Sequence, residues 1–157
     1  MAKKSSRVPK QEIGWREWIA LPDLGLPELK AKIDTGARTS AVHASGMRAF
    51  VQDGKDYVEF SIRLPGKNRK QTVVSPLLDQ REIKNTSGVP AKRFVIETTL
   101  IMGARRWPIE LSLADRANMG FELILGRTAI RRRGLLVNPG RSFLLGLPGM
   151  VDLEKSA

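Results

Sequence analysis

Turn-forming residues divide this chain of 157 residues into short segments, and their spacing constrains the fold more than any other feature. Asp53-Gly54 is a strong hairpin signal, because these residue types tolerate the positive φ angles of a tight two-residue turn. In the next segment, Tyr57–Leu64, every second residue is apolar, as in a strand with one buried face. Short strands with turn signals about every 8–12 residues are typical of an all-β sandwich or small closed barrel.

The same reasoning predicts further strands and one short helix. The other expected strands are Ile13–Leu21, Leu29–Ile33, Ser40–His43, Met47–Gln52, Gln71–Val74, Arg93–Ile101, Trp107–Leu113, Leu123–Leu125, Leu135–Val137 and Ser142–Leu145. A helix of one or two turns is expected over Arg127–Arg132, directly after a Leu-Gly-Arg segment. We therefore predict an all-β closed barrel or sandwich of short antiparallel strands with one short helix.

Length and composition indicate one compact domain. We expect it to span residues 12–147, after a disordered basic tail over 1–11 and before a C-terminal tail over 148–157. Apolar residues make up 41% of the chain and charged residues 27%, as in ordinary soluble proteins. There is no long apolar run for a membrane span and no apolar stretch typical of a secretory signal. The chain has no Cys, so disulfides and thiol chemistry are excluded and a cytoplasmic location is expected.

The formal net charge of +11 predicts attraction to anionic partners. Part of the charge lies in the N-terminal tail and part in Arg131-Arg132-Arg133. A solvated surface explains most such charge, and an acidic protein or peptide partner is the functional alternative. Nucleic acid is a less favoured partner, because no basic motif interleaved with aromatic residues is present. We expect no membrane partner.

Two segments point to chemistry. Ala31–Ala37 reads Ala-Lys-Ile-Asp-Thr-Gly-Ala and places a carboxylate, Asp34, after an apolar run and before Thr-Gly. Glu122–Arg127 reads Glu-Leu-Ile-Leu-Gly-Arg, a hydrophobic strand that ends at Gly126. An isolated Asp-Thr-Gly is most simply a β-turn in which Asp accepts a backbone N–H. Here a short strand precedes the tripeptide, and an apolar-apolar-Gly strand lies downstream in the same chain.

Together these segments resemble the signature segments of the retropepsin-like aspartic proteases. The wider pattern resembles the bacterial branch commonly labelled ATP-dependent zinc proteases. The residues that carry this resemblance are Ile13–Trp18, Leu21–Leu24, Ala31–Ala41, His43, Asp115-Arg116, Met119 and Leu125–Thr128. The resemblance implies that Asp34 is the catalytic acid and that Thr35, Gly36, Ala37, Gly126 and Arg127 support the active-site turn.

Only one Asp-Thr-Gly is present, so the resemblance implies a homodimer in which a second copy supplies the second carboxylate. Asp79 or Glu82 within the same chain is a less economical source. One departure concerns Arg38, which stands where retroviral enzymes usually have an Asp that holds substrate backbone. The charge beside the cleft is therefore reversed.

The zinc and ATP labels find no support in this sequence. A zinc site needs three or four N, S or O ligands, but the chain has one His and no Cys. No phosphate-binding Gly-rich loop of the Gly-x-x-x-x-Gly-Lys-Ser/Thr type occurs. We expect neither a metal nor a cofactor. His43 is interpreted as a packed or hydrogen-bonded residue near the Asp34 turn, with a role as a base as the minor alternative.

The sequence thus favours an aspartic endopeptidase that hydrolyses peptide bonds with water activated between two Asp34 carboxylates. Retropepsin-like enzymes cover their cleft with a hairpin, and Pro65–Lys70 is either this flap or a plain surface turn. The alternative function is a non-catalytic retropepsin-like module that binds an acidic protein or peptide through its basic surface.

Overall fold

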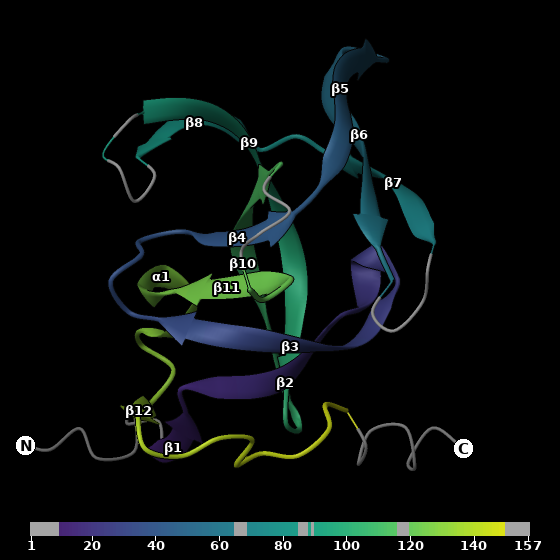
Figure 1. Ribbon diagram of the computed structural model, residues 1–157. Helices are drawn as coiled ribbons and strands as arrows, with labels where there is room; N and C mark the ends of the chain where they lie inside the picture. Colours follow the sequence, from purple (N-terminus) through teal and green to yellow (C-terminus); the bar gives the residue numbers. More distant parts are fainter. Residues whose placement is uncertain (1–9, 65–68, 85–87, 89, 116–119, 150–157) are drawn as a thin grey trace, which may run out of the picture.

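The computed structural model describes residues 10–64, 69–84, 88, 90–115 and 120–149 (Figure 1). In this part of the chain, strands alternate with tight turns and one helical turn. The elements are β1 Gln11–Gly14, β2 Arg16–Leu21, a 3-10 turn at Pro22–Leu24, β3 Leu26–Asp34, β4 Ser40–His43, β5 Ser45–Gln52, β6 Lys55–Arg63, β7 Lys70–Pro76, β8 Asp79–Lys84, β9 Pro90–Met102, β10 Arg105–Ala114, β11 Leu123–Gly126, α1 Arg127–Ile130 and β12 Leu135–Asn138. The predicted all-β fold with a short helix after Gly126 is confirmed.

The largest sheet closes into a barrel. Its strands pair in the order β10, β4, β11, β3, β2 and β9, and β9 also pairs with β10. β8 pairs with β9 and extends the sheet beyond the barrel. The late strand β11 inserts between β3 and β4, so it runs parallel to β3 and antiparallel to β4 (Figure 1). β10 also runs parallel to β4, so the barrel contains both parallel and antiparallel pairs. β1 and β12 form a separate parallel pair.

The core forms from the alternating apolar residues of the strands. On β6, Val58, Phe60 and Ile62 are buried as their spacing predicts. They pack into one cluster with barrel residues such as Leu100 and Leu111. Burial of a large aliphatic or aromatic side chain stabilises a fold by about 1.5–3 kcal/mol. The three-stranded sheet β5-β6-β7 is thereby fixed to the barrel.

The predicted hairpin turn is present between β5 and β6. Asp53 and Gly54 have φ angles of 53° and 77°, as a tight turn between antiparallel strands requires. β8 is not among the strands expected from the sequence, and it pairs with the first half of β9.

The N-terminal and C-terminal parts of the domain are joined by a buried carboxylate. Glu17 is fully buried and accepts hydrogen bonds from the backbone N–H groups of Gly14, Leu144 and Leu145 at 2.7, 2.9 and 3.2 Å. A Cβ on Gly14 would collide with the Arg141 carbonyl oxygen, so only glycine permits this close approach.

These contacts correct two of the predicted elements. Ile13–Leu21 is not one strand, because it breaks at Trp15 into β1 and β2. Ser142–Leu145 is not a strand either. Its N–H groups bond to the Glu17 carboxylate and to the Arg16 carbonyl instead of to a continuous ladder.

Ordered contacts reach slightly beyond residues 12–147 at both ends of the described chain. Gln11 begins β1, where its N–H bonds to the Gly134 carbonyl at 2.7 Å. Gly149 is buried, and its N–H bonds to the Gly103 carbonyl at 2.8 Å. Residues 1–9 and 150–157 lie outside the described residues. Within the described residues, no helix has the length and apolar character needed to cross a bilayer.

Candidate active site

Asp34 and Gly126 are paired across two parallel strands. The register aligns Leu123 with Ala31, Leu125 with Ile33, and Gly126 with Asp34. Ala31, Ile33, Leu123 and Leu125 are all buried, so the core fixes both strands up to their last residues. Asp34 is therefore the first residue to leave the packed layer, and its side chain is half-buried. The sequence prediction that the Gly126 strand packs beside the Asp34 turn agrees with this arrangement.

A tight turn follows Asp34. Its Oδ1 accepts the N–H of Gly36 at 3.1 Å, and its carbonyl oxygen accepts the N–H of Ala37 at 3.1 Å. These bonds fix the orientation of the carboxylate. Thr35 and Gly36 are exposed at the tip of the turn. The tip thus presents a hydroxyl, a residue without Cβ and an adjacent carboxylate to whatever approaches it.

Gly126 permits the turn to lie directly against β11. A Cβ at this position would lie 2.8–2.9 Å from backbone atoms of Ala37, Arg38 and Thr39. Real Cβ atoms essentially never come this close to other atoms, so the turn would have to move. The N–H of Gly126 donates to Oγ of Ser40 at 3.0 Å. The glycine is required for a close approach of two backbone segments.

Arg127 and Thr128 fasten α1 to the same turn. Nη1 of Arg127 donates to the carbonyl oxygens of Gly36 at 3.1 Å and Thr35 at 3.5 Å. The backbone N–H of Arg127 bonds to the Ala37 carbonyl at 2.8 Å. Thr128 holds the Arg38 carbonyl through Oγ1 at 2.7 Å and its N–H at 3.2 Å. Every carbonyl of the turn from Asp34 to Arg38 is therefore hydrogen-bonded.

All the predicted site residues lie together in this turn and its support, but sequence reasoning assigned no role to two hydroxyl residues. Thr128 binds the turn as described above. Ser40 is fully buried and links three strands, because its Oγ binds Gly126 and its carbonyl accepts Oγ of Ser112 at 3.0 Å. Both lie within segments that carry the family resemblance, but their spacing alone indicates no hydrogen-bond partner.

His43 lies away from the Asp34 carboxylate. It ends β4, whereas the Asp34 turn leads into the beginning of that strand, about 10 Å earlier at ~3.3 Å per residue. Its Nδ1 lies 3.3 Å from the Ala114 carbonyl. The hydrogen-bonded role predicted for His43 agrees with this contact. In the described part of the chain, no group of three or more His, Asp or Glu side chains is arranged to hold a metal ion.

A charged cluster lies next to the turn on β8 and β10. Arg81 donates through Nη1 to Glu110 at 2.7 Å and through Nε to Asp79 at 3.1 Å. The bond from Arg81 lowers the pKa of Glu110, and the nearby Arg38 guanidinium also lowers it. The bond from Arg81 likewise lowers the pKa of Asp79, assisted by the Gln80 N–H. Asp79 is thus engaged by Arg81, which does not favour it as the intramolecular partner of Asp34.

The hairpin tip considered as a flap, Pro65–Lys70, lies mostly outside the described residues. The adjoining Gln71 donates to the carbonyl of Leu24 at 2.8 Å. Leu24 precedes β3, whereas Asp34 ends it, so this hairpin meets the opposite end of the strand. The β8–β9 hairpin instead lies on the side of the barrel where β3 passes into β4 (Figure 1).

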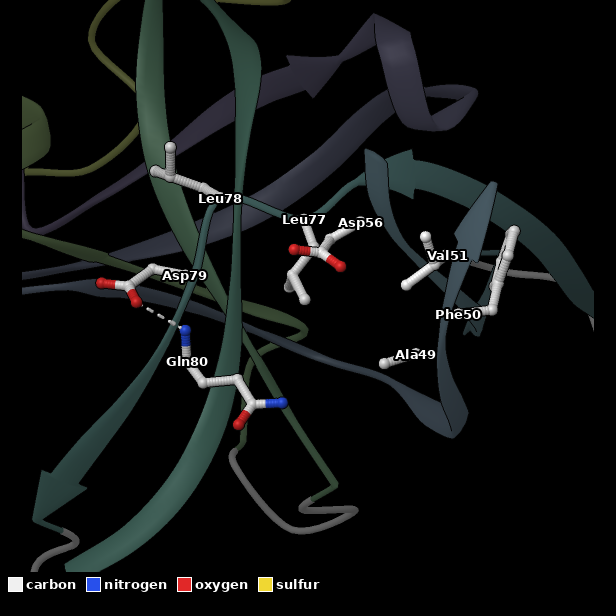
Figure 2. A pocket seen from close by; sticks show the side chains of 8 residues that line it. All are labelled: Ala49, Phe50, Val51, Asp56, Leu77, Leu78, Asp79 and Gln80. Carbon is white, nitrogen blue, oxygen red and sulfur yellow. Dashed lines mark hydrogen bonds between the residues drawn. The ribbon is translucent and has the colours of Figure 1, made fainter. Parts of the chain in front are cut away.

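A surface hollow of about 390 Å³ lies between β5 and the β7–β8 connection, and no residue of the Asp34 turn lines it (Figure 2). Apolar residues of β5 and of the β7–β8 connection line it, together with three polar side chains. The lining residues are Ala49, Phe50, Val51, Asp56, Leu77, Leu78, Asp79 and Gln80. Val51 and Leu78 remain exposed to 66% and 48%.

Comparison with known families agrees with the resemblance in sequence. A family described as the retropepsin-like aspartic endopeptidase RimB matches residues 12–146. The chain belongs to this RimB-like family. The match covers the barrel, the three-stranded sheet and the whole Asp34 site.

Similar proteins extend this result. The chain is 39% identical over 146 residues to a probable alpha-L-glutamate ligase of Shewanella pealeana, which covers 91% of this chain and 31% of that protein. It is 41% identical over 155 residues to the corresponding protein of Desulfotalea psychrophila, with 97% and 33% covered. The chain thus spans about a third of the length of the curated relatives it matches.

A crystal structure also has this fold. The protein Lpg0085 of Legionella pneumophila, of unknown function, superimposes with a TM-score of 0.73 at 27% identity. The match covers 85% of this chain and 97% of that chain.

Proposed function

We propose that this RimB-like chain is an aspartic endopeptidase whose active site forms between two copies. The observation that carries the proposal is the pairing of Asp34 with Gly126 at the ends of β3 and β11, in a chain of a retropepsin-like family. One chain contributes one Asp-Thr-Gly turn. A two-fold axis beside the turn would place a second, equivalent carboxylate opposite Asp34.

The exposed turn suits such an assembly. Thr35 and Gly36 are exposed at its tip, and Gly36 lacks the Cβ that would separate two facing turns. In such a dimer the exposed Thr35 hydroxyl would bond across to the second turn. Arg127 and Thr128 hold the backbone of each turn from the opposite side. The carboxylate is thus oriented before a substrate binds.

Two carboxyl groups about 3 Å apart cannot both be ionised, so the pair holds a single proton, as is established for aspartic proteases in general. The ionised Asp34 takes a proton from water while the protonated one donates its proton to the peptide carbonyl oxygen. The water oxygen bonds to the carbonyl carbon and a tetrahedral diol forms. The Asp34 that took the proton from water then gives it to the nitrogen, and the other Asp34 takes a proton from a diol hydroxyl as the C–N bond breaks. A carboxylic acid and an amine leave, and the pair again holds one proton.

The relatives indicate which peptides to test. They are named as probable alpha-L-glutamate ligases, and this chain matches about a third of each. The name indicates a reaction that joins glutamate, and a hydrolytic domain in the same polypeptide would suit the reverse reaction. The net charge of +11 favours binding of acidic peptides. We therefore propose α-linked glutamate-rich peptides as the substrate class.

The test is hydrolysis of an α-linked oligoglutamate peptide, followed by mass spectrometry of the products. The purified chain is expected to shorten the peptide, and Asp34→Asn is expected to abolish cleavage because it removes the ionisable group. Equal rates for the parent and Asp34→Asn would refute the proposal. A peptide of the same length made of glutamine tests the preference for acidic substrates.

Mixing tests the shared site. When parent and Asp34→Asn chains exchange freely at equal amounts, about a quarter of random dimers retain both Asp34 carboxylates. Activity per parent chain should therefore fall as Asp34→Asn is added. Activity that stays proportional to the parent chain alone would contradict a dyad shared between copies.

The second candidate function is a non-catalytic module that binds an acidic partner. The net charge of +11 favours this function, because attraction of an acidic partner to a positive surface does not require two chains to pair. Sedimentation at working concentration separates the candidates. A monomer that binds oligoglutamate and never cleaves it would support the module.

A further inference from the structure

Arg38 combines a fixed backbone with an exposed charged side chain four residues after Asp34. Its carbonyl oxygen accepts both Oγ1 and the N–H of Thr128, at 2.7 and 3.2 Å. The position of its Cα is therefore set by α1, which also supports the Asp34 turn. Within the described residues, no carboxylate forms an ion pair with the Arg38 guanidinium. Its donors remain available to a ligand.

The pairing of β10 with β4 brings Glu110 close to Arg38. β10 pairs with β4 so that Leu111 lies opposite Ser40. One residue earlier on each strand, Glu110 is level with Thr39, next to Arg38. Arg81 holds the Glu110 carboxylate at 2.7 Å from the β8 side. Glu110 is thus held by the Arg81 guanidinium of β8, level with the residue that follows Arg38, and the Arg38 charge is close enough to lower the pKa of Glu110.

This arrangement places a positive charge, unpaired among the described residues, beside the Asp34 turn. A guanidinium binds a carboxylate through two parallel N–H donors, with better geometric selectivity than an ammonium group. In a symmetric dimer the two copies of Arg38 would lie on opposite sides of the shared carboxylates. Each would therefore meet the substrate residue on one side of the bond that is cleaved.

We propose that Arg38 is a specificity-determining residue that binds substrate carboxylates on both sides of the scissile bond, and that Glu110, held by Arg81, positions its guanidinium. The inference rests on the proposed peptidase function. It adds the residues that recognise the acidic side chains. Glu110 and Arg81 act through Arg38 and are positioning residues.

Binding to a cleavage-deficient background tests the inference separately from catalysis. The probes are a fluorescent α-linked oligoglutamate and the same peptide with glutamine in place of each glutamate. Fluorescence anisotropy with Asp34→Asn is expected to show tighter binding of oligoglutamate. Adding Arg38→Gln should reduce this preference about ten-fold or more, since a charge-assisted bidentate contact is lost. Arg38→Lys should restore part of it.

Arg48→Gln in the same Asp34→Asn background is the matched control. It removes the same charge from an exposed Arg that pairs with Glu59 at 2.7 Å on the β5–β6 hairpin. The oligoglutamate preference should not change in this variant. Glu110→Gln, tested in the same background, should weaken oligoglutamate binding and leave oligoglutamine binding as it was, a difference that a purely structural role would not produce.

An unchanged preference in Arg38→Gln, or equal losses in Arg38→Gln and Arg48→Gln, would overturn the inference. So would the absence of any preference for oligoglutamate. Cleavage by the parent chain is a separate outcome. Arg38-dependent binding without cleavage would refute the peptidase and retain the acidic site, whereas cleavage without Arg38-dependent preference would retain the peptidase and refute this inference.

Discussion

Gly126 lies opposite Asp34 in the parallel pair β11–β3, and the space beside its Cα is filled by the backbone of the Asp34 turn. The last residue of one strand thus sets the position of the last residue of the other. Because the turn carbonyls are bonded by Arg127 and Thr128 immediately after Gly126, β11 and α1 together form the support on which the carboxylate rests.

Gly126→Ala is expected to displace the turn. The added Cβ would lie 2.8–2.9 Å from backbone atoms of Ala37, Arg38 and Thr39, which cannot rotate away as a side chain can. Overpacking of this kind costs about 1–3 kcal/mol of folding free energy. Displacement of the carboxylate by about 1 Å should lower kcat/KM about a hundred-fold. Urea denaturation and peptide hydrolysis measure the two effects.

Gly140→Ala is the control for this variant. A Cβ there would lie 3.4 Å from Oδ1 of Asn138, an ordinary contact. Its stability and activity should stay close to those of the parent. If Gly126→Ala were as stable and active as Gly140→Ala, the close approach at Gly126 would have no role in forming the site.

Arg127→Lys should weaken the turn while keeping the charge. The Arg127 guanidinium bonds to the carbonyls of Gly36 and Thr35, and an ammonium group does not reproduce this fork. Because Arg127 is exposed, the stability cost should be only about 1 kcal/mol or less. Activity should fall about ten-fold as the turn loses its fixed geometry. A change in Tm without a change in kcat/KM would show that Arg127 is only structural, and Arg131→Lys is the matched variant.

The sequence predicted correctly those features that depend on interactions between neighbouring residues. Asp53-Gly54 and the alternation over Tyr57–Leu64 predicted their hairpin and buried face correctly, because turn chemistry and side-chain period act between neighbouring residues. Asp34, Gly126 and Arg127 were identified through resemblance to a family. Their hydrogen bonds join residues from distant parts of the chain, so no spacing pattern displays them.

The strands that were predicted wrongly depend on contacts between residues that are far apart in the sequence. Ser142–Leu145 has the composition of a strand, but the buried Glu17 carboxylate takes the N–H groups of Leu144 and Leu145. The sequence also did not predict β8, whose pairing with β9 forms the hairpin on the side of the barrel where β3 passes into β4 (Figure 1).

Glu17→Ala should be among the most destabilising single changes in the domain. It would leave the buried N–H groups of Gly14, Leu144 and Leu145 without their acceptor. An unpaired buried donor costs about 1–3 kcal/mol, so a loss of at least 3 kcal/mol is expected. Glu17→Gln retains one acceptor oxygen and should lose less. Glu28→Ala, at an exposed position on β3, is the control, and similar denaturation midpoints for Glu17→Ala and Glu28→Ala would contradict the prediction.

The pair Arg81–Glu110 should contribute stability only when Glu110 is ionised. The hydrogen bond from Arg81 lowers the pKa of Glu110 below its ordinary 4.5. A carboxyl with a lowered pKa in the folded state stabilises the fold above the unfolded pKa, and this contribution is lost as the pH falls through the folded pKa. Because both side chains are partly exposed, the contribution should stay below about 1 kcal/mol. Arg81→Gln should therefore lower Tm by a few degrees at neutral pH and have progressively less effect as the pH falls below 4.5.

The same substitution in a Glu110→Gln background should show a much smaller dependence of Tm on pH, limited to the contribution of the exposed Asp79. A difference in Tm that stayed constant from neutral to acidic pH would show that Arg81 stabilises the β8–β9 hairpin by packing and not by its charge.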